Sequence, residues 1–305
     1  MKIFVTGATG YIGGSVAVRL AQAGHTVRGL CRDPQKAGPL RALGIEPVAG
    51  ALHDEALLKE EALRADAVIN AADADDPYAL QALLAGLHGS GRRLIHTSGS
   101  SVVGDRAAGA PSERVFTEDT PRPVRWEKRL RCETDAAVVS AAGAGVASVV
   151  LCPCLVYGAG LGLNPESIQV PGLIRTARQH GAARYIGAGQ NRWSTVHIGD
   201  LVEAYVLALT RAPAGSFFFV ENGEIAMATL AQRLHEQLGF EGKAQSWSAE
   251  EAAGEWGREG AHFAFGSNSR VSSLKLRAML GWNPRHASVL EDLPRCIRSL
   301  EAAAR

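Results

Sequence analysis

The sequence predicts an α/β protein built on a doubly wound parallel sheet, with a smaller second domain. Short β-branched runs alternate with amphipathic helical stretches through the first half, and runs such as Val146 to Leu151 lack the polar alternation of half-exposed strands. A glycine-rich turn follows the first run directly. The 305 residues, 46% of them hydrophobic, suffice for one large or two modest domains with an ordinary core.

The expected elements of the first half follow one strand-then-helix period. The first helix ends at Gly24, because glycine commonly stands just past a helix end. The expected strands are Lys2 to Thr6, Thr26 to Cys31, Glu46 to Gly50, Ala67 to Ala71, Arg93 to Ser98 and Val146 to Leu151, and the expected helices are Ile12 to Ala23, Gln35 to Leu43, Asp54 to Leu63, Tyr78 to His88 and Glu127 to Ala142.

A domain boundary is expected just after Tyr157, where a glycine-rich stretch begins and shorter elements follow. Thr195 to Leu209 resembles one more strand and helix of the first domain. We therefore expect a nucleotide-binding domain from residues 1–158 plus 193–213. Residues 159–192 plus 214–305 would form a discontinuous α+β domain that binds the substrate.

The turn after the first strand has the pattern G-x-x-G-x-x-G, formed by Gly7, Gly10 and Gly13. In such a turn the first glycine permits the sharp bend. The second lets backbone amides approach a pyrophosphate, and the third lets the helix pack closely on the sheet. Placed between a strand and a helix, this pattern predicts a bound dinucleotide.

The end of the second strand indicates which dinucleotide binds. An acidic residue there would accept hydrogen bonds from the adenosine ribose of NAD, but Cys31 and Arg32 occupy these positions. A guanidinium pairs with phosphate, so NADP is expected in preference to NAD, which stays possible. The alternative is that Arg32 simply faces solvent.

Five segments together resemble the extended short-chain dehydrogenases/reductases, a group that includes NAD-dependent epimerases and dehydratases. They are TGATGYIG at Thr6 to Gly13, the serine-bearing turn Thr97 to Gly104, PCLVYG at Pro153 to Gly158, Arg192 to Leu201, and LGWNP at Leu280 to Pro284. The resemblance covers nearly the whole chain and implies a Rossmann fold. The cofactor-binding residues that we expect are Gly7, Thr9, Gly10, Tyr11, Ile12, Gly13, Arg32, Leu52, Ala71, Ala72, Thr97 and Pro153.

The sequence departs from this family at the catalytic pair. The family uses a tyrosine that passes a proton and a lysine four residues later, but no Y-x-x-x-K is present. Aligned through Glu133, the tyrosine slot holds Arg125 and the lysine slot holds Arg129. An arginine can bind ribose hydroxyls but cannot donate a proton.

Another group must then pass the proton, and the candidates are Ser98, Ser100, Ser101, Tyr157 or a water that they hold. Glu127 would serve only if burial raised its pKa. The expected catalytic set is Ser98, Ser100, Arg129 and Tyr157. Each has a structural alternative: the serines can bond turn amides, Tyr157 can be a packed aromatic, and Arg129 can be an exposed helix residue.

Two further departures concern single positions. Alignment on Gly104 places Gly99 where the family's catalytic hydroxyl often lies, and Ala51 stands where an aspartate beside the adenine is usual. His197 and Asp200 resemble an acid/base pair, but in this family motif their role is chiefly architectural, with the acid suited to capping a helix.

Composition excludes several other classes. Lysine and arginine total 32 against 31 acidic residues, so no strong field attracts nucleic acid. The longest nearly apolar run, Val146 to Tyr157, is far shorter than the ~20 residues that span a bilayer. We see no export signal and no metal-ligand spacing, and the five dispersed cysteines fit free thiols in the cytoplasm.

The expected function is an NADP-preferring oxidoreductase that acts on a small carbonyl or alcohol substrate. Two alternatives are open: an NADP(H)-sensing protein without turnover, and an epimerase/dehydratase-type isomerase or lyase that retains its cofactor. The family resemblance also implies a homodimer through two long helices, including Glu127 to Ala142.

Overall fold

The computed structural model describes residues 1–122, 124–286 and 288–303, and its largest element is a seven-stranded sheet. The strand order is β10-β6-β5-β4-β1-β2-β3, and every pairing is parallel. This arrangement confirms the predicted doubly wound sheet. The strands are β1 Lys2–Thr6, β2 Thr26–Cys31, β3 Ile45–Ala49, β4 Ala67–Asn70, β5 Arg93–Thr97, β6 Ala147–Pro153 and β10 Ser216–Val220.

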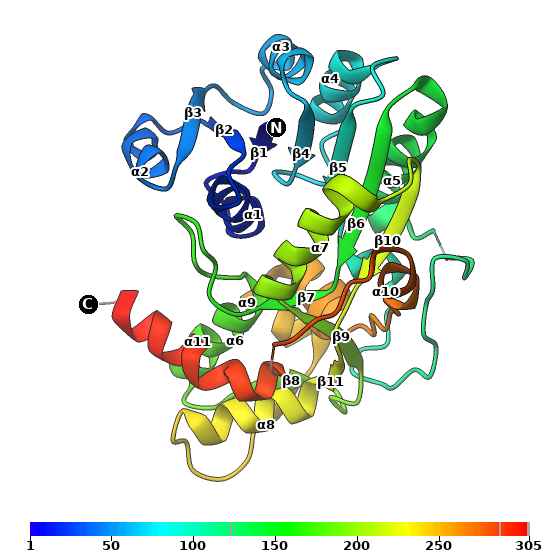
Figure 1. Cartoon of the computed structure of the whole chain (residues 1–305). Helices are drawn as coiled ribbons and strands as arrows, with labels where there is room; N and C mark the ends of the chain where they lie inside the picture. Colours follow the sequence, from blue (N-terminus) through cyan, green and yellow to red (C-terminus); the bar gives the residue numbers. More distant parts are fainter. Residues whose placement is uncertain (123, 287, 304–305) are drawn as a thin grey trace.

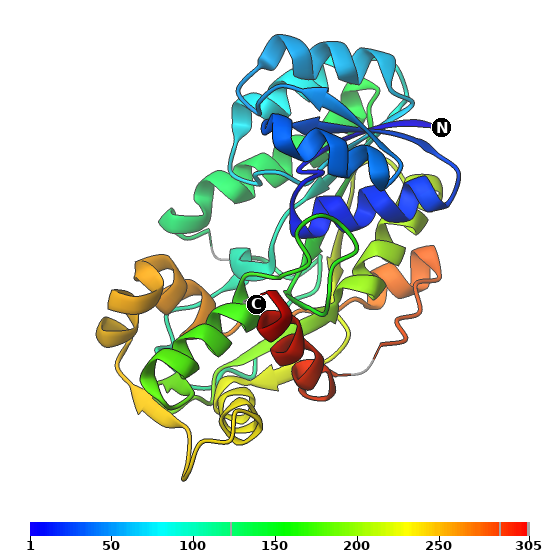
Figure 2. The same cartoon turned by 90° about the vertical axis from the view of Figure 1, so that its left-hand side faces the viewer.

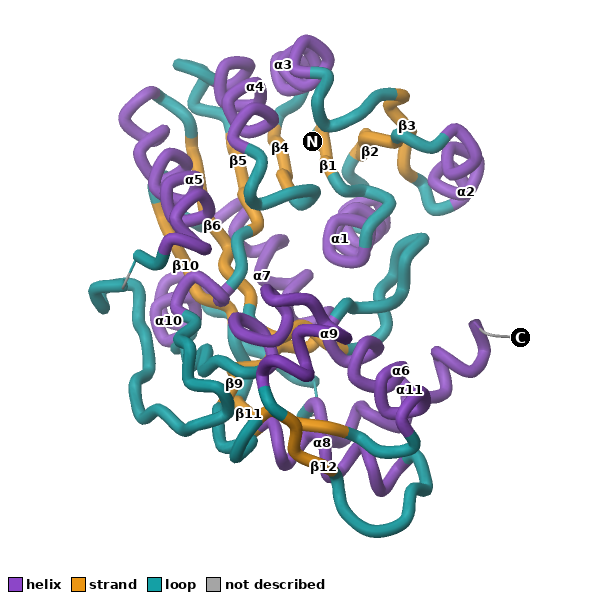
Figure 3. Tube along the Cα trace, turned by 180° about the vertical axis from the view of Figure 1, so that it is seen from behind, coloured by secondary structure: helices purple, strands orange, loops and turns teal. Residues whose placement is uncertain are grey.

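Helices cover both faces of this sheet. Helix α1 (Tyr11–Gln22) and helix α7 (Ile198–Arg211) pack together over one face, as Figure 1 shows. Figure 3, from behind, shows α4 (Pro77–Leu87) and α5 (Arg129–Ser140) over the other face, where α3 (Glu55–Arg64) packs against α4. The short helix α2 (Ala37–Ala42) lies beside β3.

Local sequence fixes where these helices begin. Asp54 accepts a hydrogen bond from the backbone of Leu57 and so caps α3. Asp76 caps α4 in the same way, with Pro77 at the first helical position. Such caps hold the helices at fixed positions along the sheet, and thereby hold the loops that form the site.

The second domain has its own hydrophobic core, and it lies below the large sheet in Figures 1 and 2. It contains a three-stranded sheet and a two-stranded one. Trp193 and Trp247 belong to this core. Its strands are β7 Leu155–Tyr157, β9 Arg192–His197, β11 Glu224–Ala226, β8 Arg184–Ile186 and β12 Gln245–Trp247, and its helices are α6 Gln169–His180, α8 Met227–Gln237, α9 Ala249–Glu259 and α11 Val289–Ala303.

The strand arrangement corrects the expected domain boundaries. The second segment of the predicted substrate domain begins at residue 214, but β10 in this segment pairs with β6 as the outermost strand of the large sheet. Its apolar run Phe217 to Val220 is buried, as expected for a strand covered on both faces. Strand β9, which was assigned to the first domain, instead joins β7 and β11. Residues 304–305 of the predicted domain lie outside the described part.

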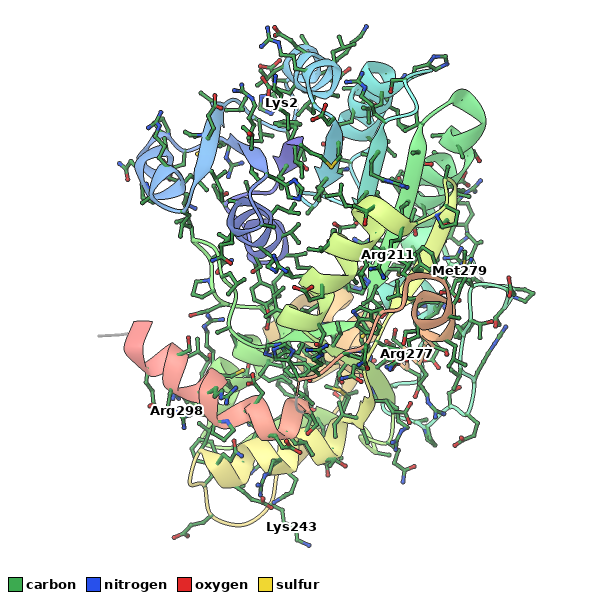
Figure 4. The ribbon with its side chains drawn as sticks, in the orientation of Figure 1. Lys2, Arg211, Lys243, Arg277, Met279 and Arg298 are labelled. Carbon is green, nitrogen blue, oxygen red and sulfur yellow. The ribbon has the colours of Figure 1, made fainter. Side chains whose placement is uncertain are left out.

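The molecule is elongated, with the large sheet at one end and the second domain at the other. Figure 4 shows Lys2 at the end of the large sheet near α3, and Lys243 at the opposite end in the loop after α8. Helix α10 (Leu274–Leu280) packs against β10 and α7, which returns the chain to the first domain before α11. Among the described residues, no helix combines the length and apolar character needed to cross a bilayer.

Candidate cofactor and active site

A cleft of about 610 Å³ opens at the carboxyl ends of β1, β4, β5 and β6. Strand order reverses on the two sides of β1, so the first turn of the chain lies where ligands bind in open parallel sheets. Gly10 lies in the wall at one part of the cleft and Ser98 at another, while Phe263 from the second domain covers it. The cleft therefore joins the glycine turn to the serine-bearing turn.

The glycine turn is built as its spacing predicts. Gly7 has a φ of +72°, and a Cβ there would lie 2.5 Å from the carbonyl oxygen of Ala71. A Cβ on Gly13 would lie 2.5 Å from the carbonyl oxygen of Gly7. Both positions exclude any larger residue, because these carbonyls belong to the backbone directly after β4 and directly after β1, not to flexible side chains.

Helix α1 begins directly after this turn, with Gly10 at its N-cap and no side chain capping it. No acidic residue lies in its first turn. The first backbone N–H groups of a helix lack internal partners and carry a partial positive charge. The turn and the open helix end therefore fit a dinucleotide pyrophosphate, which the amides of this end would hold.

Arg32 stands at the end of β2 with an exposed side chain. No described side chain pairs with its guanidinium. The next residue, Asp33, uses its carboxylate to accept a hydrogen bond from the backbone of Gln35, 2.9 Å away. The end of β2 thus presents a cation, while its nearest acid is engaged in a local turn.

Eight of the predicted site residues line the cleft, and the others do not. Gly7 and Gly13 act inside the turn, and Leu52 packs against the core of the first domain. Thr97 is buried and its hydroxyl bonds to that of Tyr205. The residues in the wall are Gly10, Tyr11, Ile12, Ala71, Ala72, Ser98, Ser100 and Pro153, and those outside it are Gly7, Thr9, Gly13, Arg32, Leu52, Thr97, Arg129 and Tyr157.

Arg129 was expected beside the cofactor ribose, but the structure places it on the outer face of α5. Its side chain pairs with Glu133 and lies over the ring of Trp126. The inward positions are Lys128 and Arg131, both of which line the cleft. Alignment through Glu133 selected Arg129, four residues before that acid. The cleft-facing pair with the same spacing is Arg131 and Asp135, so the alignment was wrong by two residues.

Tyr157 was expected to face the substrate, but it is fully buried outside the cleft. Its ring packs edge-on against His197, with ring centres 5.4 Å apart. Burial raises the pKa of its phenol above the ordinary value. The packed-aromatic alternative describes this residue, and a cleft-facing tyrosine is instead Tyr11, whose hydroxyl donates to the carbonyl oxygen of Gly158 at 2.7 Å.

Ser98 lies at the floor of the cleft, and its hydroxyl donates to the carboxylate of Asp135 over 2.8 Å. The two residues are 7% and 1% exposed. Burial raises the pKa of Asp135 to about 6, although the hydrogen bond from Ser98 and the charges of Arg122 and Arg131 act to lower it. Sequence reasoning selected Ser98 and missed Asp135.

Several other polar groups of the cleft have partners. Ser100 accepts a hydrogen bond from Ser269 over 2.8 Å, and Lys128 pairs with Glu259 across the two domains. Arg131 pairs with Asp75. Glu127, the carboxyl considered earlier, pairs with Arg106 and is absent from the cleft wall. Within the described ranges, no cluster of three or more His, Cys, Asp or Glu residues could hold a metal ion.

A parallel sheet with a glycine turn at its switch point and an open helix end is the architecture of a dinucleotide-binding domain. The model of the NAD dependent epimerase/dehydratase family matches residues 3–218. The chain belongs to this family and is an NAD(P)-dependent enzyme of the oxidoreductase type.

Three curated relatives are similar over most of the chain. The Acremonium protein named oxidase ucsJ is 31% identical over 96% of this chain and 95% of its own length. The Stigmatella aurantiaca 4-hydroxy-2-methyl-3-oxo-4-farnesyl-3,4-dihydroquinoline-1-oxide ketoreductase is 30% identical over 73% and 69%. The Stenotrophomonas maltophilia 2-alkyl-3-oxoalkanoate reductase is 31% identical over 78% and 76%.

Solved structures show the same fold. The crystal structure of a UDP-glucose 4-epimerase from Thermotoga maritima superposes with a TM-score of 0.78 over all of both chains. The two sequences are 19% identical, so this likeness describes the fold.

Proposed function

We propose that the protein reduces a small carbonyl compound with NADPH in this cleft. The observation that carries the proposal is the continuity of the cleft from the open end of α1, which fits a pyrophosphate, to the hydroxyl of Ser98. The reduced nicotinamide would supply the hydride. This chain's own residues would hold the coenzyme, orient the carbonyl and provide the proton.

The preference for NADPH rests on the end of β2. Arg32 is exposed there, and no described residue pairs with its guanidinium. The neighbouring charge, Asp33, is engaged by the backbone of Gln35. A guanidinium can bind a ribose 2′-phosphate through two parallel hydrogen bonds, whereas it offers no acceptor to a free 2′-hydroxyl.

A small ketone or related carbonyl compound is the proposed substrate. The ketoreductase and the oxoalkanoate reductase are relatives whose names describe the reduction of a keto group. A sugar nucleotide is disfavoured, because the Y-x-x-x-K pair that usually serves the family in oxidising a sugar hydroxyl is absent from the sequence.

The missing tyrosine also supports a second candidate, a protein that binds NADPH and reports it without turnover. An isomerase or lyase with a retained coenzyme is the third. The test is oxidation of NADPH and NADH over a panel of small ketones and aldehydes, with the alcohol product identified by mass spectrometry. Turnover that favours NADPH supports the proposal. Micromolar binding without turnover supports the sensor, and a retained coenzyme without net oxidation supports the isomerase or lyase.

We also propose a cytoplasmic location, since all five cysteines are unpaired thiols, as a reducing compartment would keep them. Trp126 and Leu130, exposed beside Arg129 on the outer face of the α5 region, are proposed to contribute to a homodimer. Sedimentation of the wild type and of Trp126→Glu tests this: a dimer that dissociates in the variant is expected, and a wild-type monomer would contradict it.

A further inference from the structure

Asp135 is a buried carboxyl group that is not needed to bind a dinucleotide. It lies on α5 beneath the cleft floor, and its Oδ2 accepts the hydrogen bond from Ser98. Its other oxygen, Oδ1, is buried without a hydrogen-bond partner. A carboxyl in such surroundings holds its proton more readily than an exposed one does, because burial penalises the charged form.

The orientation of the groups behind Asp135 follows from a chain of hydrogen bonds that starts at β1. The amide of Ala71 donates to the hydroxyl of Thr6 at 3.2 Å, which leaves that hydroxyl to donate to Asn70 Oδ1 at 2.6 Å. Asn70 must then present its Nδ2 to His96 Nδ1, 3.1 Å away. Neutral His96 therefore carries its proton on Nε2.

This proton points toward Asp135. His96 Nε2 lies 3.9 Å from Asp135 Oδ1, too far for a hydrogen bond, and it has no other partner in the described structure. Burial lowers the pKa of His96 to about 4, so the ring stays neutral near pH 7. Next to Asp135 Oδ1, the neutral ring of His96 thus presents the dipole of its N–H bond but no positive charge.

Positive charges close to Asp135 favour its ionised form once a proton has left. Arg131 on the same helix and Arg122 act on Asp135 in this sense. Asp75 opposes them, and the thiol of Cys152 on β6 also lies close, with a pKa that burial raises. The carboxyl is therefore placed between two states of comparable stability, which suits a group that exchanges a proton near neutral pH.

No other cleft hydroxyl in the described structure has this connection to a buried acid. Tyr11 donates to a backbone carbonyl, Ser100 accepts from Ser269, and Ser101 accepts from Arg131 over 3.3 Å. The carboxylates that line the cleft, Glu166 and Glu259, pair with Arg175 and Lys128.

We infer that Ser98 delivers the proton to the substrate oxygen and that Asp135, acting through Ser98, supplies it. This inference rests on the proposed function. When Asp135 is protonated, its carboxyl donates the hydrogen bond to Ser98 Oγ, and the O–H of Ser98 is free to turn toward the substrate. During reduction this O–H bond of Ser98 breaks as the O–H bond of the product forms, while the hydride from the reduced coenzyme reaches the carbonyl carbon. Ser98 regains a proton from the carboxyl of Asp135, which becomes a carboxylate. After the alcohol leaves, a proton from bulk solvent, carried by hydronium or a buffer acid, enters through the open cleft and reaches the carboxylate of Asp135 through Ser98, which replaces the proton given to the product.

The arrangement also accounts for the absence of a serine at position 99. A Cβ at Gly99 would lie 3.2 Å from Arg131 Nη1, so Arg131 fills the space that a side chain there would need. The hydroxyl is supplied one residue earlier, by Ser98, and the acid behind it comes from the helix face that also carries Arg131. Asp135 is thus a positioning residue, and Ser98 is the catalytic one.

The kinetic test uses Ser98→Ala, Asp135→Asn and the double variant with NADPH and the best ketone of the panel. Each single change is expected to lower kcat on the order of 100-fold, which is a usual size for lost general acid catalysis. The double variant is expected to lose little more, because the two groups act as a unit. Ser148→Ala, at a buried serine of β6 outside the cleft, and Asp119→Asn, at an exposed loop, are the matched controls.

The pH profile separates a proton supplier from a structural residue. The protonated form of Asp135 is the active form for reduction, so kcat should fall as pH rises through its pKa, about 6 in the free protein. The reverse oxidation should rise over the same range. Asp135→Asn should abolish this dependence. An active variant that keeps the wild-type profile, or single losses that multiply in the double variant, would overturn the inference while leaving the proposed function intact.

A measurement on the coenzyme-free protein is independent of turnover. Infrared difference spectra between the wild type and Asp135→Asn should contain the carbonyl band of a carboxyl that titrates near pH 6. Ser98→Ala should move this titration to higher pH, because the hydrogen bond from Ser98 stabilises the carboxylate. A band that titrates at an ordinary aspartate pH, or one that Ser98→Ala leaves in place, refutes the pair. A wild type inert on every ketone refutes the proposed function, and the spectra still decide the pair.

Discussion

Arg131 lies directly over Gly99, with its Nη1 3.2 Å from the point where a Cβ on that glycine would stand. The guanidinium is held there by Asp75 on one side and by Ser101 on the other. A fixed cation thus lies beside the serine turn, in the position from which it can attract the negative groups of a bound coenzyme or substrate.

Replacement of Arg131 by Met should therefore weaken NADPH binding and lower turnover by tenfold or more, because a charge-assisted hydrogen bond contributes about 1.5–3 kcal/mol. Isothermal titration calorimetry and steady-state kinetics measure the two effects. Arg129→Met, two residues earlier and on the exposed face, is the matched control and should change neither. The reverse result would restore Arg129 to the site.

Gly13→Ala should destabilise the protein by about 1–3 kcal/mol and weaken NADPH binding, since the new Cβ would lie 2.5 Å from the carbonyl of Gly7 and push the turn outward. Urea denaturation measures the stability. Gly38→Ala is the matched control because it also lies in a helix, and its Cβ would meet nothing within 4 Å. It should stabilise the protein by up to about 1 kcal/mol. Equal stability and equal NADPH binding in the two variants would show that the turn does not require a glycine at position 13.

Arg32→Asp should weaken NADPH binding by tenfold or more and leave NADH binding within a few-fold. The change removes the proposed phosphate partner and puts a negative charge near the 2′-phosphate. Competition binding with the two reduced coenzymes measures the ratio. Arg41→Asp, at another exposed arginine on the adjacent helix α2, controls for net charge. Equal losses of affinity for both coenzymes in Arg32→Asp would contradict the proposal that Arg32 binds the 2′-phosphate.

Tyr11→Phe should cost about 1 kcal/mol of stability, because the carbonyl of Gly158 loses its donor. It should leave kcat and its pH dependence nearly unchanged, since the hydroxyl of Tyr11 is directed away from proton transfer. Tyr78→Phe, at an exposed tyrosine, should change neither quantity. A large fall of kcat in Tyr11→Phe, with stability retained, would make Tyr11 the proton donor in place of Ser98.

Much of the first domain could be predicted because its local signals agree with its tertiary structure. The strands Lys2–Thr6 and Thr26–Cys31 have the predicted bounds. The glycine turn could also be predicted, because the close backbone contacts of the turn require glycine at fixed intervals, and these intervals can be read in the sequence. Strand β10 was missed although its apolar run was a clear signal, because sequence order does not tell which sheet a late strand joins.

The inward face of α5 could not be predicted for a different reason. Arg131 and Asp135 on α5, and Lys128 just before it, face inward, and these polar residues give no apolar stripe from which to phase the helix. Arg129 and Arg131 are indistinguishable by type. Only the packing of α5 against β6 decides which of them faces the cleft.

The binding of a reduced coenzyme by the wild-type protein is the most direct test of the central claim, which is that the open end of α1 holds a dinucleotide. Calorimetric titration should give saturable binding of NADPH at micromolar concentration or below, and weaker binding of NADH. Absence of heat and of any fluorescence change with both coenzymes would contradict the account.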